Sequence, residues 1–296
     1  MSIPRPDMVP FAKMNGIGNR IVVADLRGRA DTFSEDAARK LGHDPDTGFD
    51  QLMAIHDAEE GGNDASIRIY NTDGSRAGAC GNGTRCVVDW LHTNDAPRGG
   101  DAVFHFTVDG QPLAAKRLED GRISVNMGVP RFDWTQIPLS EEFADTSGIE
   151  LEVGPLGAPI LHTPAVANIG NPHCVFFTNE NPDTYALDKF GPMLEHHMLF
   201  PDRANISIAQ VRSPTTLKLR TWERGAGLTL ACGSAACAAV VCAVRRGLTE
   251  RAITVSLPGG ELDIEWRHDN FIIMTGTATH EFDGTLDPAT GEWSRA

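Results

Sequence analysis

Two cysteines stand in matching surroundings, each at a point where a helix is expected to begin. Cys80 is followed by Gly81 and Cys232 by Gly233, after a polar loop that contains glycine and before an apolar helical pattern. The first turn of a helix has unpaired backbone N–H groups and the positive end of the helix dipole, which favour a thiolate and bind anions. Each junction therefore combines an acid/base group with backbone donors for a carboxylate.

Both junctions belong to an internal repeat. Ile17-Gly18-Asn19 recurs as Ile169-Gly170-Asn171, and Ala79-Cys80-Gly81 recurs at the same offset as Ala231-Cys232-Gly233. The copies span residues 11–132 and 163–282. The repeat predicts two pseudo-symmetric halves that face each other across a cleft, with one thiol on each side.

Thiols on opposite sides of a substrate suit the inversion of a stereocentre. One thiolate removes the α-proton, and the other thiol returns a proton from the opposite face. The plainer alternative, that Cys80 and Cys232 are small apolar residues at helix starts, stays open. The remaining cysteines lie inside apolar patterns and are expected to pack in the core; they are Cys86, Cys174, Cys237 and Cys242.

Composition narrows the function further. The chain has 296 residues, 41% of them hydrophobic, and a net charge of −14, which favours two globular domains and argues against binding to nucleic acid or anionic membranes. The longest apolar run, residues 235–244, is too short to cross a bilayer and predicts a buried helix. Prolines at positions 4 and 6 argue against a signal peptide, and six cysteines are too few for a disulfide scaffold, so we expect a cytoplasmic protein.

No pattern in the sequence indicates a cofactor or a metal. There is no Cys-x-x-Cys pair for zinc, and none of the five lysines stands in a motif that suggests a Schiff base. The segment from Cys80 to Gly83 lacks the lysine and the hydroxyl residue of a phosphate-binding P-loop. We therefore expect a small-molecule substrate and no cofactor.

Longer stretches around the two cysteines resemble the diaminopimelate epimerase family. They are Asn71-Thr72-Asp73-Gly74-Ser75 through Ala79-Cys80-Gly81-Asn82-Gly83-Thr84-Arg85-Cys86, and Glu223-Arg224-Gly225-Ala226-Gly227 through Ala231-Cys232-Gly233-Ser234. Residues 14–19, 48–51, 170–175 and 203–205 extend the resemblance over nearly the whole chain.

The resemblance implies a cofactor-independent epimerase that interconverts LL- and meso-diaminopimelate with two cysteines, in lysine and peptidoglycan precursor synthesis. It implies an α+β fold of two duplicated domains, each a mixed β-sheet wrapped around a central helix, with the active site in the cleft between them. It also implies a homodimer.

The family's site residues carry over to positions in this sequence. Cys80 and Cys232 become the acid/base pair, while His173 and Glu223 bind the α-amine or tune the pKa of the thiols. Backbone groups hold the reacting carboxylate at Gly81, Asn82, Gly233 and Ser234. The other substrate-binding positions are Asn19, Gln51, Asn71, Asn171, Asn205, Glu223 and Arg224, whose amides and guanidinium suit a second amino-acid head group. Taken singly, each Asn is also typical of a turn, His173 of a core, and Arg224 of a solvated surface.

We place the N-terminal half at residues 1–132, with the tail 283–296 as a candidate addition, and the C-terminal half at 133–282. Residues 133–162 are rich in acidic residues, Pro and Gly, as a linker is. The chain departs from the family pattern at Arg20-Ile21, Leu228 and Ala235. None of these changes removes a reacting group.

Two other functions remain open from the sequence. A related two-thiol racemase would share the fold and the cysteines but act on another amino acid. Arg224 with Asn71, Asn171 and Asn205 favours a zwitterionic distal end instead. A non-catalytic amino-acid-binding protein would be expected to lack one of the cysteines, and both are present.

Overall fold

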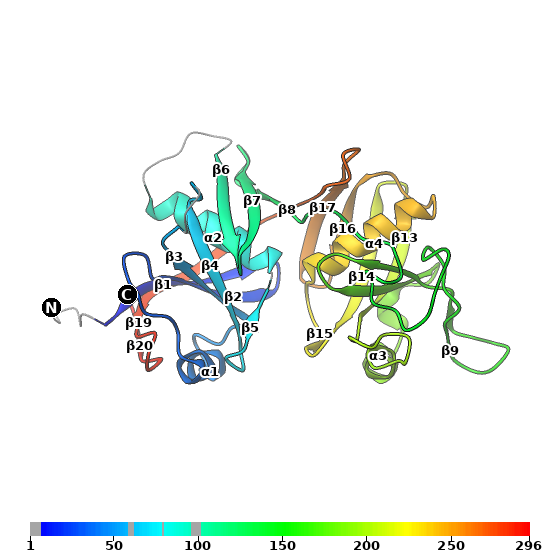
Figure 1. The fold of residues 1–296 in the computed structure, drawn as a ribbon, viewed down its shortest axis with the longest axis horizontal. Helices are drawn as coiled ribbons and strands as arrows, with labels where there is room; N and C mark the ends of the chain where they lie inside the picture. Colours follow the sequence, from blue (N-terminus) through cyan, green and yellow to red (C-terminus); the bar gives the residue numbers. More distant parts are fainter. Residues whose placement is uncertain (1–6, 59–61, 79, 96–101) are drawn as a thin grey trace. The chain divides into compact units, whose positions relative to one another are not determined.

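The computed structural model describes residues 7–58, 62–78, 80–95 and 102–296. The chain forms two units, one of Met1–Val125 with Gly276–Ala296 and one of Asn126–Thr275 (Figure 1). The sequence indicated divisions after residues 132 and 282. Residues 126–132 instead bond within the second unit, where Met127 N–H donates to Ile272 O at 2.9 Å and Arg131 N–H to Asn168 O at 2.9 Å.

The first unit is a mixed sheet. Its strands follow the order β20-β19-β1-β2-β3-β4-β6-β7-β8, parallel at β2–β3 and β4–β6 and antiparallel elsewhere. The strands are β1 (Val9–Gly16), β2 (Asn19–Asp25), β3 (Gln51–His56), β4 (Ala65–Asn71), β5 (Arg76–Ala77), β6 (Val103–Val108), β7 (Gln111–Arg117), β8 (Ile123–Asn126), β19 (Thr279–Leu286) and β20 (Trp293–Arg295), and the helices are α1 (Glu35–His43) and α2 (Gly81–Asn94).

The second unit is also a mixed sheet. Its order is β11-β12-β13-β14-β16-β17-β18, parallel at β12–β13 and β14–β16. The strands are β9 (Glu152–Val153), β10 (Leu161–His162), β11 (Ala165–Asn168), β12 (Pro172–Thr178), β13 (Asn205–Ser213), β14 (Thr216–Glu223), β15 (Gly227–Leu228), β16 (Ala252–Leu257), β17 (Gly260–Trp266) and β18 (Ile272–Gly276), and the helices are η1 (Pro182–Thr184), α3 (Leu187–Glu195) and α4 (Gly233–Arg245).

The series of elements from β1 to β8 recurs from β11 to β18. Each strand pair of the first series has a counterpart of the same sense in the second, including the short antiparallel strands β5 and β15. The helices recur too, with α2 between β5 and β6 and α4 between β15 and β16. The duplicated α+β fold expected from the sequence is confirmed.

One helix in each unit is enclosed by the sheet. In α4 every residue from Ala235 to Ala243 is completely buried, as a helix that is apolar on all sides must be. It packs against β11, β12, β13, β14 and β17, and α2 packs in the same way against β1, β2, β3 and β7. The cysteines expected in the core lie there without exposed surface; they are Cys86, Cys174, Cys237 and Cys242.

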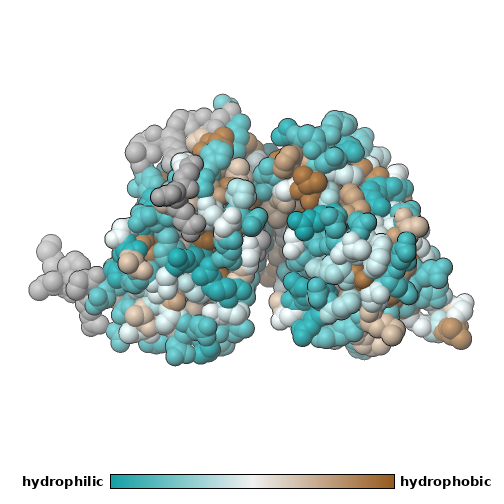
Figure 2. Space-filling view, in the orientation of Figure 1, coloured by the Kyte–Doolittle hydropathy of each residue, from teal (hydrophilic) through white to brown (hydrophobic). Residues whose placement is uncertain are grey.

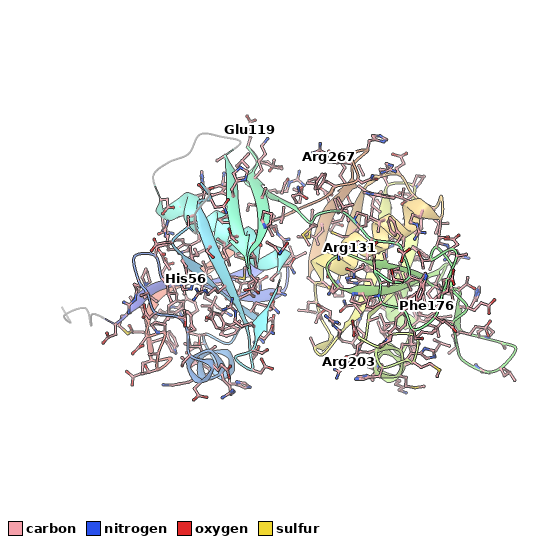
Figure 3. All side chains as sticks on the ribbon, in the orientation of Figure 1. His56, Glu119, Arg131, Phe176, Arg203 and Arg267 are labelled. Carbon is pink, nitrogen blue, oxygen red and sulfur yellow. The ribbon has the colours of Figure 1, made fainter. Side chains whose placement is uncertain are left out.

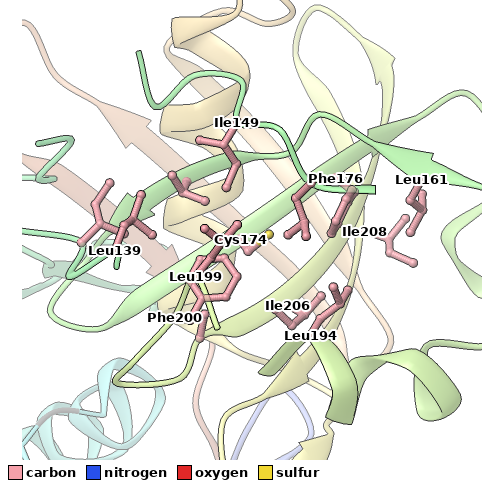
Figure 4. Close-up of a cluster of buried hydrophobic side chains, with 14 of the residues drawn as sticks. Leu139, Ile149, Leu161, Cys174, Phe176, Leu194, Leu199, Phe200, Ile206 and Ile208 are labelled. Carbon is pink, nitrogen blue, oxygen red and sulfur yellow. The ribbon is translucent and has the colours of Figure 1, made fainter. Parts of the chain in front are cut away.

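The segment 133–162 is not the linker that its composition indicated. Leu139, Ile149 and Leu161 are buried in the same cluster as Cys174 and Phe176 of β12 (Figure 4). Its acidic, Pro and Gly residues shape the turns that bring these widely spaced apolar side chains inward. The segment therefore belongs to the core of the second unit.

Hydrophilic side chains cover most of the face of each unit that Figure 2 shows, and hydrophobic ones appear there in small groups. Within the described ranges, no helix has both the length and the hydrophobicity needed to span a membrane.

Candidate active site

Cys80 is the N-cap residue of α2. Its backbone is extended, with φ −151° and ψ 97°, and its Sγ accepts a hydrogen bond from the Gly83 N–H at 3.2 Å. Its carbonyl oxygen accepts from the Thr84 N–H at 2.9 Å and so begins the helix. The sulfur thus lies at the positive end of the helix dipole, where a thiolate is stabilised.

Candidate polar residues of the first unit gather at one end of its sheet, near Cys80. The thiol donates to Oε1 of Gln51, the first residue of β3, at 3.6 Å. Asn71, the last residue of β4, is the cross-strand partner of Gln51. Asn19 begins β2, the parallel neighbour of β3, and its Oδ1 is shielded from solvent with no partner among the described residues.

The start of α2 lies directly against β1. A Cβ atom at Gly16 would lie 3.1 Å from both Cβ and the carbonyl oxygen of Asn82, a tight contact that glycine avoids. Asn82 is itself buried. The backbone of Gly81 and Asn82 is therefore fixed at the edge of the sheet that carries Asn19 and Gln51.

Arg20, one of the departures from the family pattern, connects β2 to β3 at the sheet edge that carries Asn19 and Gln51. Its guanidinium bonds Asp50 Oδ1 at 3.0 Å, and its backbone N–H donates to Asp50 Oδ2 at 2.8 Å. Arg20 follows Asn19 and Asp50 precedes Gln51, so the pair joins the two strands beside both candidate residues. The adjacent departure, Ile21, is fully buried in the core.

Cys232 occupies the equivalent N-cap position of α4 but in different surroundings. The residue is 4% exposed, its side chain makes no capping bond, and its Sγ lies 3.6 Å from Ser234 Oγ. Burial, followed by the negative charge of Glu223, raises the pKa of the Cys232 thiol well above its ordinary value. Cys232 is therefore a protonated thiol at neutral pH in this conformation.

Glu223 is held in place by its own hydrogen bond. It ends β14, and its carboxylate accepts a hydrogen bond from the Thr229 hydroxyl in the loop that leads to α4. This contact keeps the charge close to the sulfur.

His173 is a buried, neutral imidazole. Burial and the charge of Arg224 lower its pKa to about 3. Its Nε2 lies 2.8 Å from Asn171 Oδ1, so Nε2 carries the hydrogen and Nδ1 the lone pair. That Nδ1 is shielded from solvent and has no partner among the described residues. It is therefore a buried acceptor that the described residues leave unsatisfied.

Arg224 and Asn205 are joined through the backbone. Asn205 is buried beside His173 in the parallel β12–β13 ladder, and its Oδ1 accepts from the Arg224 N–H at 2.9 Å. The Arg224 side chain is exposed, and its Nη1 donates to the Asp202 carbonyl at 2.8 Å. One edge of the guanidinium is thereby fixed.

Each unit thus gathers candidate residues around the first turn of its enclosed helix. The first unit holds Asn19, Gln51, Asn71, Cys80, Gly81 and Asn82, and the second holds Asn171, His173, Asn205, Glu223, Arg224, Cys232, Gly233 and Ser234. Sequence reasoning missed Glu195, which bonds both sides of the Glu223-Arg224 pair, and Arg203, whose Nη1 lies 3.8 Å from Glu195 Oε1. Figure 3 labels Arg203. The sequence signal that could have drawn attention to Glu195 is its place at the C-terminal end of a helix, where the helix dipole disfavours a carboxylate.

The sequence model of the family described as diaminopimelate epimerase matches residues 11–132 and 165–281. The chain belongs to this family. The matched segments nearly coincide with the two repeat copies. Diaminopimelate epimerase of Brucella anthropi is 60% identical over 285 residues, which cover 96% of this chain and 94% of that protein.

Solved structures of lower identity share the fold. A phenazine biosynthesis protein of the PhzF family from Enterococcus faecalis superposes with a TM-score of 0.68 at 14% identity, covering 94% of this chain and 99% of that one. A hydroxyproline epimerase from Agrobacterium vitis, with bound trans-4-hydroxy-L-proline, gives a TM-score of 0.66 at 13% identity, covering 96% and 94%.

The surroundings of Cys232 generate a testable prediction. Replacing Glu223 with Gln removes the negative charge and lowers the pKa of the thiol, so more thiolate is present at pH 8. Half a pKa unit corresponds to about a three-fold faster reaction with iodoacetamide. Peptide mapping by mass spectrometry measures the rate at Cys232, with Glu261→Gln as the control. An unchanged or slower rate would contradict the electrostatic role of Glu223.

Proposed function

We propose that this protein interconverts LL- and meso-diaminopimelate without a cofactor, with Cys80 and Cys232 as the two proton-transfer groups. The observation that carries the proposal is the placement of one cysteine at the N-cap of the enclosed helix in each repeated unit. The 60% identity to a diaminopimelate epimerase over nearly the full length of both chains supports the substrate. The reaction would serve lysine and peptidoglycan precursor synthesis.

In this proposal the helix starts hold the substrate carboxylate. Gly81 and Asn82 open α2, and Gly233 and Ser234 open α4. Their N–H groups point beyond the helix ends, as the first N–H groups of a helix do. When the α-proton leaves, negative charge spreads onto the carboxylate, and these donors stabilise it.

In this proposal one cysteine begins as the thiolate and the other as the thiol. The Gly83 N–H that donates to the Cys80 sulfur supports Cys80 as the base, and the raised pKa of the Cys232 thiol beside Glu223 supports Cys232 as the acid. Cys80 then removes the α-proton and Cys232 delivers one from the opposite face, so the α-carbon is inverted. Each turnover exchanges the two states, and the reverse reaction starts from the exchanged form.

The α-ammonium is bound by His173 and Glu223. A neutral imidazole supplies the Nδ1 lone pair and the carboxylate supplies a counter-charge. Asn171 holds the ring through its Nε2–H and so fixes the tautomer that leaves Nδ1 as the acceptor.

The exposed guanidinium of Arg224 binds the carboxylate of the distal amino-acid group of diaminopimelate. The amides of Asn19, Gln51, Asn71 and Asn205 complete the set of donors and acceptors. A racemase of another amino acid is the second candidate, since the hydroxyproline epimerase shares the fold. A substrate such as proline carries no second charged head, which Arg224 is suited to bind.

The homodimer and the cytoplasmic location expected from the sequence form part of the same proposal. Sedimentation at micromolar concentration tests the first, and cell fractionation tests the second.

Removal of either thiol tests the reaction. We expect Cys80→Ala and Cys232→Ala each to lose about 10²–10⁴-fold or more in turnover of diaminopimelate, because each takes away one proton-transfer group. Cys242→Ala, a packing cysteine in α4, is the matched control and should keep most of the activity. Circular dichroism checks the fold, and near-parental turnover in either catalytic variant would refute the two-thiol mechanism.

Exchange of Arg224 tests the substrate. Arg224→Lys keeps the positive charge but loses the bidentate fork, so kcat/KM for diaminopimelate should fall by about ten-fold or more, equivalent to ~1.4 kcal/mol. Arg267→Lys on the surface of the same unit is the control. If Arg224→Lys keeps the kcat/KM of the unsubstituted protein, Arg224 does not bind the distal carboxylate, and another amino acid becomes the favoured substrate.

A further inference from the structure

Glu195 is a buried carboxylate outside the candidate site. It is the last residue of α3, and its side chain is 4% exposed. Both features disfavour a negative charge, because the C-terminal end of a helix repels it and burial removes its hydration. Such a group persists only where specific donors compensate for both costs.

The donors to Glu195 come from both sides of the Glu223-Arg224 pair. Trp222 Nε1–H donates to Oε2 at 2.7 Å, and Gly225 N–H donates to Oε1 at 3.0 Å. One carboxylate therefore holds the residue before Glu223 and the residue after Arg224.

A close contact between α3 and Trp222 supports this arrangement. A Cβ atom at Gly191 of α3 would lie 2.7 Å from Cγ of the Trp222 ring, so the glycine lets the indole approach the helix closely. The same indole donates its Nε1–H to the carboxylate of Glu195 at the end of α3.

The loop before Asn205 is attached to the same residue. Arg203 has a left-handed backbone with φ 60°, and its Nη1 lies 3.8 Å from Glu195 Oε1. The Glu195 carbonyl accepts from the Ala204 N–H at 3.4 Å. This loop also holds Arg224, through the Asp202 carbonyl and the Asn205 side chain.

We propose that Glu195 is a positioning residue that sets the orientation of Arg224 toward the distal carboxylate of the substrate. It fixes the turn that carries Arg224 and the loop that receives its guanidinium, and it touches no substrate itself. The inference rests on the proposed function, since it assigns Arg224 to substrate binding.

A neutral amide cannot replace this carboxylate. Gln has one acceptor oxygen, and its NH₂ group would meet either Trp222 Nε1–H or Gly225 N–H, donor against donor. We expect Glu195→Gln to raise KM for diaminopimelate by about ten-fold or more while kcat changes less than about three-fold, because Arg224 loses its orientation while the Thr229 hydroxyl still holds Glu223 beside Cys232. Glu261→Gln, which alters a carboxylate bonded to Ser256 at the surface of the same unit, should match the parent.

A double-mutant cycle separates positioning from a general loss of structure. If Glu195 acts through Arg224, the double variant Glu195→Gln/Arg224→Lys loses clearly less kcat/KM than the product of the single losses. The proposal would be overturned if the losses in kcat/KM of the two single variants multiply in the double variant, or if Glu195→Gln lowers kcat and leaves KM unchanged. Should Glu195→Gln fail to fold, Trp222→Phe, which removes one donor to Glu195, takes its place in the cycle.

The same cycle distinguishes this proposal from the proposed function. If Arg224→Lys has a reduced kcat/KM and the losses of the two single variants multiply in the double variant, only the positioning role of Glu195 is rejected. An Arg224→Lys variant with parental kinetics rejects the binding role of Arg224 and the positioning role of Glu195 together, while the cysteine variants still test the epimerase reaction.

Discussion

The beginning of each enclosed helix is the constraint on which the structure depends. A helix surrounded by a sheet has its first N–H groups at a fixed place, and those groups need partners. In α2 the sulfur of Cys80 supplies one by accepting from Gly83. In α4 the equivalent sulfur does not act as a cap and lies instead in a shielded place near Glu223. A cysteine sulfur and the first N–H groups of a helix therefore come from the same piece of backbone geometry in each unit.

Duplication repeats the backbone, and the side chains around it make the units differ. The parallel pairs β2–β3 and β12–β13 occupy equivalent places, but the first pairs Ile21 with Gln51 and the second pairs His173 with Asn205. The candidate polar residues of the first unit are amides, whereas those of the second unit include an arginine, a carboxylate and a neutral imidazole. One scaffold thus places its two cysteines in unequal surroundings.

The sequence predicted the features that short-range patterns determine. The Cys-Gly junctions do begin α2 and α4, because an extended residue followed by an apolar helical pattern defines a helix start locally. The apolar run of α4 indicated its complete burial. Segment 133–162 was misread because composition says little about a few apolar side chains, such as Ile149, that are inserted between turns.

Contacts between distant residues were beyond such patterns. Glu195 bonds Trp222 and Gly225 only because α3 packs against the end of β14, and nothing in the local sequence specifies that packing. The pairing of Arg20 with Asp50 likewise depends on the parallel register of β2 and β3. The roles of Arg224 and the asparagines came from the family resemblance, since an Asn or an Arg alone has many ordinary uses.

The fate of solvent hydrogen during the first turnovers tests the two-thiol inversion most directly. LL-diaminopimelate is incubated with the protein in heavy water without added cofactor, the reaction is stopped at low conversion, and both isomers are analysed by mass spectrometry. An acid on the face opposite the base delivers solvent deuterium to the meso product, while the base can return only the original hydrogen to the substrate. The account predicts deuterium at the α-carbon of the meso product and none in the recovered LL-isomer. Early deuterium in the recovered LL-isomer at the level of the product, or a meso product without deuterium, would contradict it.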